Sequence, residues 1–271
     1  MDRYILPAQY LIYSRLKSKL AILSWVVIYM IPLYSYVYIF CNDRFGIVFV
    51  LLMLSFMAFY SLYDLGYIYN DVFTTQKEEY PNFRIDKQVR ILLLKEYPKI
   101  VLFKILLFAG FVWVAYLIAK WYNVSIYLSQ YMMIVFLVGF FFGLHNVIRN
   151  RFNIVTFALL SWFKYIAPLF LIVSYVDIGL FLWLSFLIFP MVRVIEHATK
   201  TKYGLTKWQK IIRSHDAFRV KYYLVLTIVC IILAFKQVEY SYFLLGLAIY
   251  FFVYRVLIYL MIHFKFYKRK A

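Results

Sequence analysis

The segment from Tyr67 to Arg84 reads YIYNDVFTTQKEEYPNFR and follows directly on an apolar run. Asp71 and Glu78 are spaced so that a helix continued through the segment would place both carboxylates on one face, with Asn70 beside them. Charge at the mouth of a membrane helix is costly, and function is its default explanation. Such oxygen ligands suit Mg²⁺, which is usually held by one or two carboxylates plus substrate phosphates. The segment therefore predicts a magnesium diphosphate site with Asn70, Asp71 and Glu78 as metal ligands.

A second interpretation of this stretch needs no ligand. Asp71 is equally suited to capping a helix, and Glu78 to lying in solvent balanced by Lys77 and Arg84. Thr74 falls between the two acids on the helical face and adds a hydroxyl to either arrangement. The spacing leaves both interpretations open.

A second polar set follows Pro190, where the sequence reads PMVRVIEHATK. Arg193, Glu196 and Lys200 stand at i, i+3 and i+7, which places them on one helical face. The planar fork of an arginine and the point charge of a lysine both suit phosphate oxygens. Arg193 and Glu196 are also well spaced for a structural ion pair, and the pattern does not choose between these uses.

Three further features lie at or inside apolar runs. His145 and Arg149 end the fourth run, where interfacial residues orient a span, and they also offer polar groups to a ligand. Lys164 lies well inside an apolar run, so we expect it to face the bundle interior, a cavity or a carboxylate unless it extends to the membrane surface. Gly139 and Gly143 form a GxxxG pair, which predicts close helix packing.

Membrane helices must position these side chains. The chain of 271 residues is 66% apolar and 23% aromatic, which lies outside the range of soluble domains. A spanning helix needs roughly 20 apolar residues, so charged stretches can be used to separate the runs. The runs lie near 20–40, 46–68, 98–119, 124–143, 153–176, 178–195, 221–236 and 240–262. We therefore predict an all-α fold, a polytopic membrane bundle of about eight transmembrane helices in a single domain over 1–271.

The net charge of +18 follows this topology. Lysines and arginines gather before the first run, after the second, fourth and sixth runs, and in the tail, whereas the other connections are nearly neutral. The positive-inside rule then places both termini and the basic connections in the cytoplasm. This placement explains the basic residues without nucleic acid. The richness in Lys, Ile, Tyr, Phe and Asn is compatible with a bacterial inner membrane. Cys41 and Cys230 are too few for a thiolate metal site or a disulfide framework.

In order and spacing the motifs resemble those of the UbiA superfamily of intramembrane prenyltransferases. That family carries NDxxDxxxD after its second span, and Asn70 and Asp71 match the opening of this motif. Thr74 replaces its second acid, and Glu78 stands where the third belongs. Arg84 fits the usual continuation of the motif.

The later motifs resemble the same family. One branch, similar to decaprenyl-phosphate phosphoribosyltransferase, has a KRxxEL-like second motif, and the VRVIEH sequence around Arg193 and Glu196 looks like a diverged form of it. The family's YxxxK at the end of the fourth span corresponds to His145 and Arg149. Lys164 lies where related sequences have a basic residue in the fifth span.

The resemblance implies a UbiA-like fold, with two cytoplasmic polar loops over a lipid-facing cavity for an isoprenoid tail. It implies that Mg²⁺ held by Asp71 and Glu78 neutralises a diphosphate, and that Arg193, Lys200 and Arg149 stabilise the same leaving group. Glu196 is left with three roles: to hold a second metal, to orient Arg193, or to accept a proton.

Three hypotheses of function follow. The RxxE-like motif favours a transferase that joins a polyprenyl phosphate acceptor to a phosphoribosyl-diphosphate-like donor. The wider family implies transfer of a prenyl group from prenyl diphosphate to an aromatic or other acceptor. The third hypothesis is a catalytically degenerate protein that binds lipid or a partner. A transporter is a weaker fourth, because the polar residues cluster at one face and mark no path across the bilayer.

Overall fold

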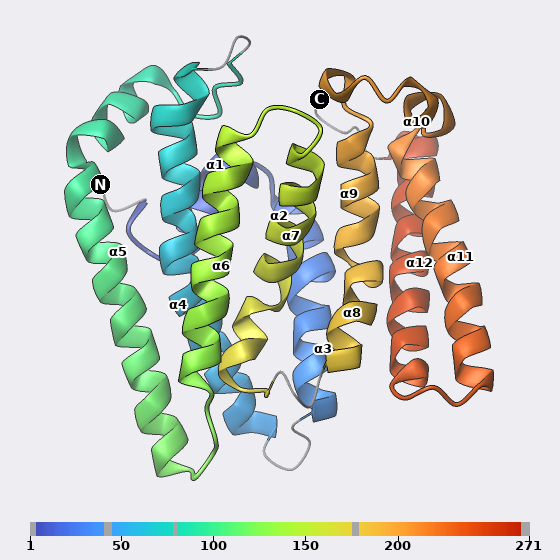
Figure 1. Cartoon of the computed structure of the whole chain (residues 1–271), viewed down its shortest axis with the longest axis horizontal. Helices are drawn as coiled ribbons and strands as arrows, with labels where there is room; N and C mark the ends of the chain where they lie inside the picture. The colour runs from blue at the N-terminus through green and yellow to red at the C-terminus, as the bar shows by residue number, and fades with distance from the viewer. Residues whose placement is uncertain (1–3, 41–44, 78–80, 175–178, 267–271) are drawn as a thin grey trace. The chain divides into compact units, whose positions relative to one another are not determined.

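The computed structural model describes residues 4–40, 45–77, 81–174 and 179–266, and within these ranges every regular element is a helix (Figure 1). The α-helices are α1 (Gln9–Arg15), α2 (Lys19–Trp25), α3 (Ile31–Phe40), α4 (Phe45–Tyr69), α5 (Lys87–Trp121), α6 (Leu128–Val147), α7 (Asn153–Ile166), α8 (Gly179–Ile188), α9 (Pro190–Ala198), α10 (Thr206–Ile211), α11 (His215–Phe235) and α12 (Ser241–His263). π-helical turns lie at Val26–Met30 and Asn70–Thr74, and 3-10 turns at Thr75–Lys77, Ala167–Leu171 and Thr201–Tyr203.

Seven helical stretches of the described chain are long and apolar enough to cross a membrane. They are Lys19–Ile39, Gly46–Lys77, Lys87–Trp121, Leu128–Val147, Asn153–Leu171, His215–Phe235 and Ser241–His263. This is consistent with an integral multi-pass membrane protein, a polytopic bundle of helices as the sequence predicts. The number differs from the predicted eight because the run 178–195 does not form one continuous helix.

That run is divided between α8 and α9, which have 10 and 9 residues. The break falls at Phe189, directly before Pro190 at the start of α9. Proline has no N–H to donate and its ring obstructs the preceding turn, so an uninterrupted helix is disfavoured there. Each half alone is too short to span a bilayer.

The break leaves carbonyl groups of α8 without helical partners, and two tyrosines of α11 satisfy them. Tyr222 donates its hydroxyl hydrogen bond to the carbonyl of Leu187 at 2.5 Å, and Tyr223 donates to the carbonyl of Ile188 at 2.8 Å. An unsatisfied carbonyl in an apolar environment costs several kcal/mol, about as much as a lost hydrogen bond there. The two phenols therefore make the interrupted helix tolerable.

The chain forms two compact units, which we describe separately. The first contains the described residues of Met1–Ile148 and Phe163–Asp177, and the second those of Arg149–Trp162 and Ile178–Ala271. The chain passes from one unit to the other within α7, between Trp162 and Phe163.

In the first unit α4 is the central element and packs against α5 and α6 (Figure 1). Near the end of α4 that carries Asn70, Ile68 and Val72 join Tyr10 of α1 and Leu93 of α5 in a buried apolar cluster. Packing of this cluster fixes α1 and the start of α5 beside the predicted site, since apolar burial stabilises a membrane-surface segment as it does a soluble core.

Close packing in this unit uses a glycine other than the predicted pair. A Cβ added to Gly66 of α4 would lie 3.0 Å from the ring of Phe142 on α6. By contrast, none of the described atoms lies within 4 Å of a Cβ added to Gly139 or Gly143. The prediction that this GxxxG pair mediates close helix packing is therefore wrong within the described chain, and α6 contributes a large side chain to the contact instead.

The second unit is built on the antiparallel hairpin of α11 and α12, with α8 and α9 beside it. Tyr223 of α11 stacks on Phe251 of α12, with ring centroids 5.2 Å apart. Both rings are buried, and so is Arg255, one helical turn further along α12. The hairpin thus carries a charged side chain within an apolar span.

Candidate functional site

Asp71 lies in the π-helical turn Asn70–Thr74 that extends α4. Single π-helical turns inside α-helices are rare and occur frequently at functional sites. In this wider turn the carbonyl of Asn70 accepts the backbone N–H of Thr75, and the hydroxyls of Thr74 and Thr75 also donate to it at 3.1 and 2.9 Å. The side chain of Asp71 is nearly inaccessible to solvent, with 3% of the residue exposed.

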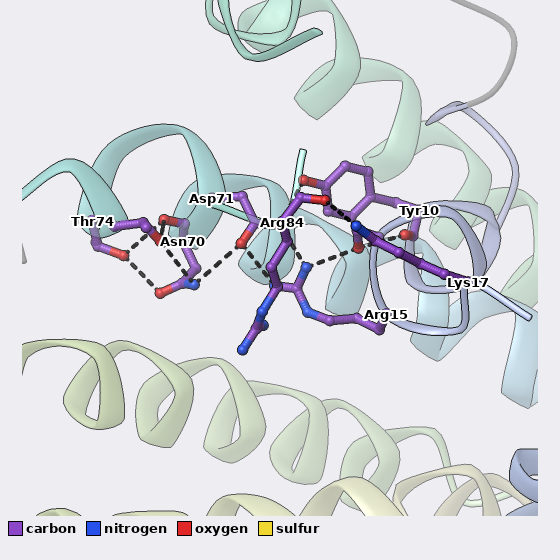
Figure 2. A network of polar contacts seen from close by, with 9 residues as sticks. Tyr10, Arg15, Lys17, Asn70, Asp71, Thr74 and Arg84 are labelled. Carbon is purple, nitrogen blue, oxygen red and sulfur yellow. Dashed lines mark hydrogen bonds and ion pairs between the residues drawn. The ribbon is translucent and has the colours of Figure 1, made fainter. Parts of the chain in front are cut away.

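Both carboxylate oxygens of Asp71 are engaged by α1 (Figure 2). Arg15 donates from Nη1 to Oδ2 at 2.5 Å and from Nη2 to Oδ1 at 2.9 Å, a bidentate ion pair. Tyr10 donates a hydrogen bond to Oδ2 at 2.8 Å. Bidentate arginine–carboxylate pairs are among the strongest in proteins, so α1 is held firmly to the end of α4.

Tyr10 reflects this environment. Burial, and next the carboxylate of Asp71, raise the pKa of the Tyr10 hydroxyl well above its usual value. A phenol with a raised pKa stays protonated and keeps donating its hydrogen bond to Asp71. Tyr10 therefore acts as a permanent donor at neutral pH.

Asn70 and Thr74 lie on the other side of Asp71 in Figure 2. Thr74 donates to Oδ1 of Asn70 at 2.7 Å, which orients the amide. The Nδ2 of Asn70 then faces Oδ1 of Asp71 at 3.4 Å. The structure thus brings together three predicted site residues, Asn70, Asp71 and Thr74.

The described residues do not fit a ready metal site. Both oxygens of Asp71 already accept hydrogen bonds from cationic or phenolic donors, and Oδ1 of Asn70 accepts from Thr74. No group of three or more His, Cys, Asp or Glu side chains in the described ranges is arranged to hold a metal. Glu78, the other predicted ligand, lies outside the described residues. A divalent cation at Asp71 would have to displace Arg15.

Arg84, predicted to bind substrate, is exposed. Its carbonyl accepts a hydrogen bond from Nζ of Lys17 at 2.8 Å, which ties the loop after α4 to the end of α1 (Figure 2). Arg84 is therefore near the Asp71 network through its backbone, by a contact that its side-chain chemistry did not predict.

Lys164 faces the interior of the first unit, as expected, but tyrosines rather than a carboxylate receive it. Its Nζ donates to the hydroxyl of Tyr67 at 3.0 Å and lies 4.5 Å from the ring centroid of Tyr63. Arg15 lies 4.5 Å from the ring centroid of Tyr67 as well. Aromatic faces attract cations, more strongly in a desolvated site. Tyr67 therefore links the two cations, Arg15 and Lys164.

A second buried ion pair lies one heptad earlier on α4. Lys104 of α5 donates to Oδ2 of Asp64 at 2.9 Å, and both side chains are completely buried. Lys104 also donates to the carbonyl of Leu6 at 3.0 Å. Asp64 and Asp71, seven residues apart, are therefore both paired, each with a cation from a different helix. The sequence offered a signal, since a lysine inside an apolar run needs a partner.

In the second unit Glu196 pairs with Arg219 of α11 rather than with Arg193. Arg219 donates to the two oxygens of Glu196 at 2.5 and 2.8 Å and to Asp216 at 2.9 Å. The alternative of an ion pair between Arg193 and Glu196 is therefore wrong: Arg193 is exposed, and Arg219 reaches Glu196 with a bidentate fork. From the sequence, Arg219 is only one of several basic residues after the sixth apolar run, and no pattern singles it out.

A buried polar triad holds the loop after α9. Tyr203 donates to Oδ1 of Asn153 at 2.5 Å, and Nε2 of His197 lies 2.6 Å from the Tyr203 hydroxyl. Phe157 stacks on His197, with centroids 4.1 Å apart. Burial raises the pKa of Tyr203 to about 12, although the charge of Arg149 opposes the shift. The triad fixes the start of α7 to the loop that follows α9.

The remaining predicted residues are distributed between the units. His145 lies in the last turn of α6 in the first unit and is partly buried. Arg149 and Lys200 belong to the second unit, and both are exposed. The second unit also contains a residue that the sequence reasoning missed, Arg255 on α12, whose signal was a lone charge inside the last apolar run.

Comparison of the chain with family models, with curated proteins and with solved structures found no match. The resemblance to the UbiA superfamily therefore depends on the motifs alone.

Proposed function

We propose that the chain is an intramembrane transferase of the UbiA type, acting on a phosphate or diphosphate attached to an isoprenoid lipid or to its reaction partner. The observation that carries the proposal is the buried network at the end of α4. It places Asp71 and two cations, Arg15 and Lys164, around one tyrosine at the mouth of a membrane helix. Buried charge at this position is costly and is best explained by function.

In the proposed reaction an oxygen of a polyprenyl phosphate forms a bond to the anomeric carbon of a phosphoribosyl-diphosphate-like donor. The bond from that carbon to the diphosphate breaks, and the diphosphate leaves with the electron pair. Lys164 supplies positive charge toward the leaving oxygens, while Asp71 holds Arg15 in place as a second cation. Arg193, Lys200 and Arg149 are proposed phosphate-binding residues by the resemblance.

The alternative direction of transfer uses the same chemistry. The bond from the allylic carbon of a prenyl diphosphate to its diphosphate breaks, and the diphosphate leaves with the electron pair. The allylic carbon forms a bond to an aromatic or other acceptor, which releases the proton from that position to solvent. Tyrosines that surround Lys164 are suited to stabilise a developing allylic cation. The reaction panel below separates the two directions.

One observation favours a second candidate function, a lipid-binding protein without catalysis. Arg15 and Tyr10 use both oxygens of Asp71, the residue that corresponds to the family's first metal ligand. A carboxylate saturated in this way performs a structural task, because bidentate pairing fixes helices together. The fold would then hold a lipid without turning it over.

The test is a reaction panel with the purified chain in detergent and Mg²⁺. One arm pairs polyprenyl phosphate with phosphoribosyl diphosphate, and the other pairs prenyl diphosphate with aromatic acceptors. We expect product in one arm, and a loss of about 100-fold or more in Asp71→Asn, the order of effect of removing a group that organises transition-state charge.

Asp64→Asn is the matched control. It also removes a carboxylate from a buried ion pair on α4, but at a position where no catalytic role is proposed. Equal loss of turnover in the two variants would show that only the stability of α4 is being measured. Absence of product from both arms, together with saturable binding of polyprenyl phosphate, would replace the transferase by the lipid-binding candidate.

The orientation of the chain is part of the proposal: an active site on the cytoplasmic side of a bacterial inner membrane, with both termini cytoplasmic. Both termini share a side only if the chain crosses the membrane an even number of times, so the proposal includes α8 and α9 crossing together as one broken helix in addition to the seven long stretches. The abundance of lysine and arginine in the even-numbered connections supports it. Labelling of single cysteines introduced at Lys207 and Lys236 in intact cells tests it, since only Lys236 should react with an impermeant reagent.

A further inference from the structure

Arg255 is a buried cation inside an apolar span. It lies on α12, within the membrane-length stretch Ser241–His263, and only 9% of the residue is exposed. From its position eight residues before the end of α12, it lies about 12 Å along the axis from that end. Arginine at such a depth is rare and, as a rule, paired or functional.

The guanidinium of Arg255 has no oxygen partner among the residues that the structure describes. Its Nε is buried without a hydrogen bond, and no carboxylate of the described chain forms an ion pair with it. Only Nε is both buried and unpartnered, so the terminal nitrogens reach accessible space. Its one close contact is with the ring of Tyr254, 5.2 Å from the centroid.

The acids nearest to Arg255 are already used. Arg219 engages both oxygens of Glu196 and also binds Asp216. The hydroxyl of Tyr223 donates to the carbonyl of Ile188 and does not accept a hydrogen bond from Nε of Arg255. Neighbouring groups therefore leave the charge of Arg255 uncompensated.

A second free cation lies in the same neighbourhood. Arg193 lies on α9, which packs against α11, the helix that carries Arg219. The carboxylates of Glu196 and Asp216 are both bound to Arg219. The excess charge is positive, and the groups with donors to spare are Arg193 and Arg255.

Burial of an unpaired guanidinium is expensive, and an anion with several oxygens removes most of that cost. The terminal nitrogens of arginine form a planar fork that matches two oxygens of a phosphate. A carboxylate has only two oxygens to share between the two arginines, whereas a phosphate offers more.

We propose that Arg255, assisted by Arg193, forms an anion site in the second unit that binds a phosphate group. The phosphate is carried either by an anionic lipid headgroup or by a soluble phosphate or diphosphate. Arg255 takes no part in the Asp71 network, and its binding of phosphate does not depend on the transferase proposal, which also assigns Arg193 to phosphate by the resemblance.

The experiment measures binding to the full chain in a neutral detergent by native mass spectrometry and by thermal stabilisation. One arm titrates phosphatidylglycerol against diacylglycerol, and the other titrates inorganic phosphate and diphosphate against chloride at constant ionic strength. We expect saturable binding in one arm, weakened about tenfold or more in Arg255→Gln.

Arg213→Gln is the matched control, because Arg213 is an exposed arginine of the same unit and its loss changes the net charge equally. Its affinity should stay within about twofold of wild type. Equal weakening in both variants would mean non-specific attraction and would overturn the proposal.

Arg255→Lys is a second variant that tests the site with less risk of misfolding. It retains the charge without the fork, and we expect intermediate affinity. Should Arg255→Gln fail to fold, the wild-type chain still decides: no saturable stabilisation by either phosphatidylglycerol or the soluble phosphates rejects the site. Which arm responds identifies the source of the phosphate.

Discussion

The two units treat buried charge differently. In the first, Asp64 and Asp71 each have a dedicated cation from another helix, and the additional cation, Lys164, lies among tyrosines. In the second, one arginine serves both nearby acids, and Arg255 is left with no oxygen partner in the described chain. The buried acids of both units are paired with cations, although Oδ1 of Asp64 accepts no hydrogen bond, whereas Lys164 and Arg255 are cations without a carboxylate partner in the described chain.

This difference teaches how to interpret the site. The motif chemistry directs attention to carboxylates as metal ligands, whereas the contacts indicate that the groups with capacity to bind are positive and suited to phosphate oxygens. The first unit compensates its extra cation with aromatic faces, which attract an ammonium without neutralising it. Arg255 also lies over an aromatic ring, that of Tyr254, but its buried Nε has no hydrogen-bond partner, whereas Lys164 donates to Tyr67. Arg255 should therefore respond to added anions more than Lys164.

The largest expected effect is on the completely buried pair of the first unit. Lys104→Met leaves the Asp64 carboxylate buried without its cation, and we expect a loss of about 3–5 kcal/mol in the free energy of unfolding. Thermal unfolding in detergent measures it. The double variant Asp64→Leu with Lys104→Met should recover most of the loss, since an apolar pair replaces a buried ion pair at little cost.

In the second unit the paired and unpaired arginines should behave oppositely. Arg219→Met leaves Glu196 without its partner and should cost about 2–4 kcal/mol. Arg255→Met removes an uncompensated buried charge, so in the absence of phosphate its melting temperature should equal or exceed that of wild type. Comparable destabilisation by both substitutions would break the comparison, because it would reveal an anionic partner already in place for Arg255.

Arg15→Gln probes whether Asp71 can change partners. The variant keeps α1 but loses the bidentate pair, and we expect a cost of about 2–3 kcal/mol. It also frees one side of a buried carboxylate, so Mg²⁺ should stabilise the variant more than wild type in thermal unfolding. If Mg²⁺ stabilises both proteins equally, Asp71 is not where the metal binds.

The smallest effect is expected at Tyr203. Tyr203→Phe loses a hydrogen bond to Asn153 and should cost about 1 kcal/mol at neutral pH. The pKa of Tyr203 is raised to about 12, against 10 for a free phenol, and this difference fixes how its contribution to stability changes at alkaline pH. Between these values only the unfolded chain loses the proton, so this residue's contribution is complete below about pH 10 and falls as the pH rises toward 12. The variant should show a shallower alkaline loss, measured by unfolding at pH 9 and 11.

Much of the helical architecture could be predicted from the sequence, because apolar runs of membrane length admit few other structures. The run 178–195 is divided at Pro190 into α8 and α9, and hydropathy did not show this break because it counts residues without regard to backbone donors. The prediction of close packing at Gly139 and Gly143 failed because a small residue permits a close helix contact but does not bring a neighbouring helix to it.

The site was predictable in its residues and not in their partners. Asn70, Asp71 and Thr74 were found because polar side chains at a helix mouth are conspicuous. Arg15 was not, because it lies 56 residues before Asp71, and no local pattern joins positions so far apart. Arg255 did have a local signal, a single charge within an apolar run, but the run was interpreted only as a spanning helix.

The pairing of α4 also sets an order of membrane insertion. Tyr10 and Arg15 are synthesised before Asp71, so when α4 leaves the ribosome the partners of that carboxylate already exist. Asp64 has no such advantage, since Lys104 follows it by 40 residues. A charged carboxylate is costly in lipid by itself, so α4 and α5 should enter the bilayer together as one hairpin. A nascent chain arrested before Lys104 is exposed should integrate α4 inefficiently unless Asp64 is replaced by leucine.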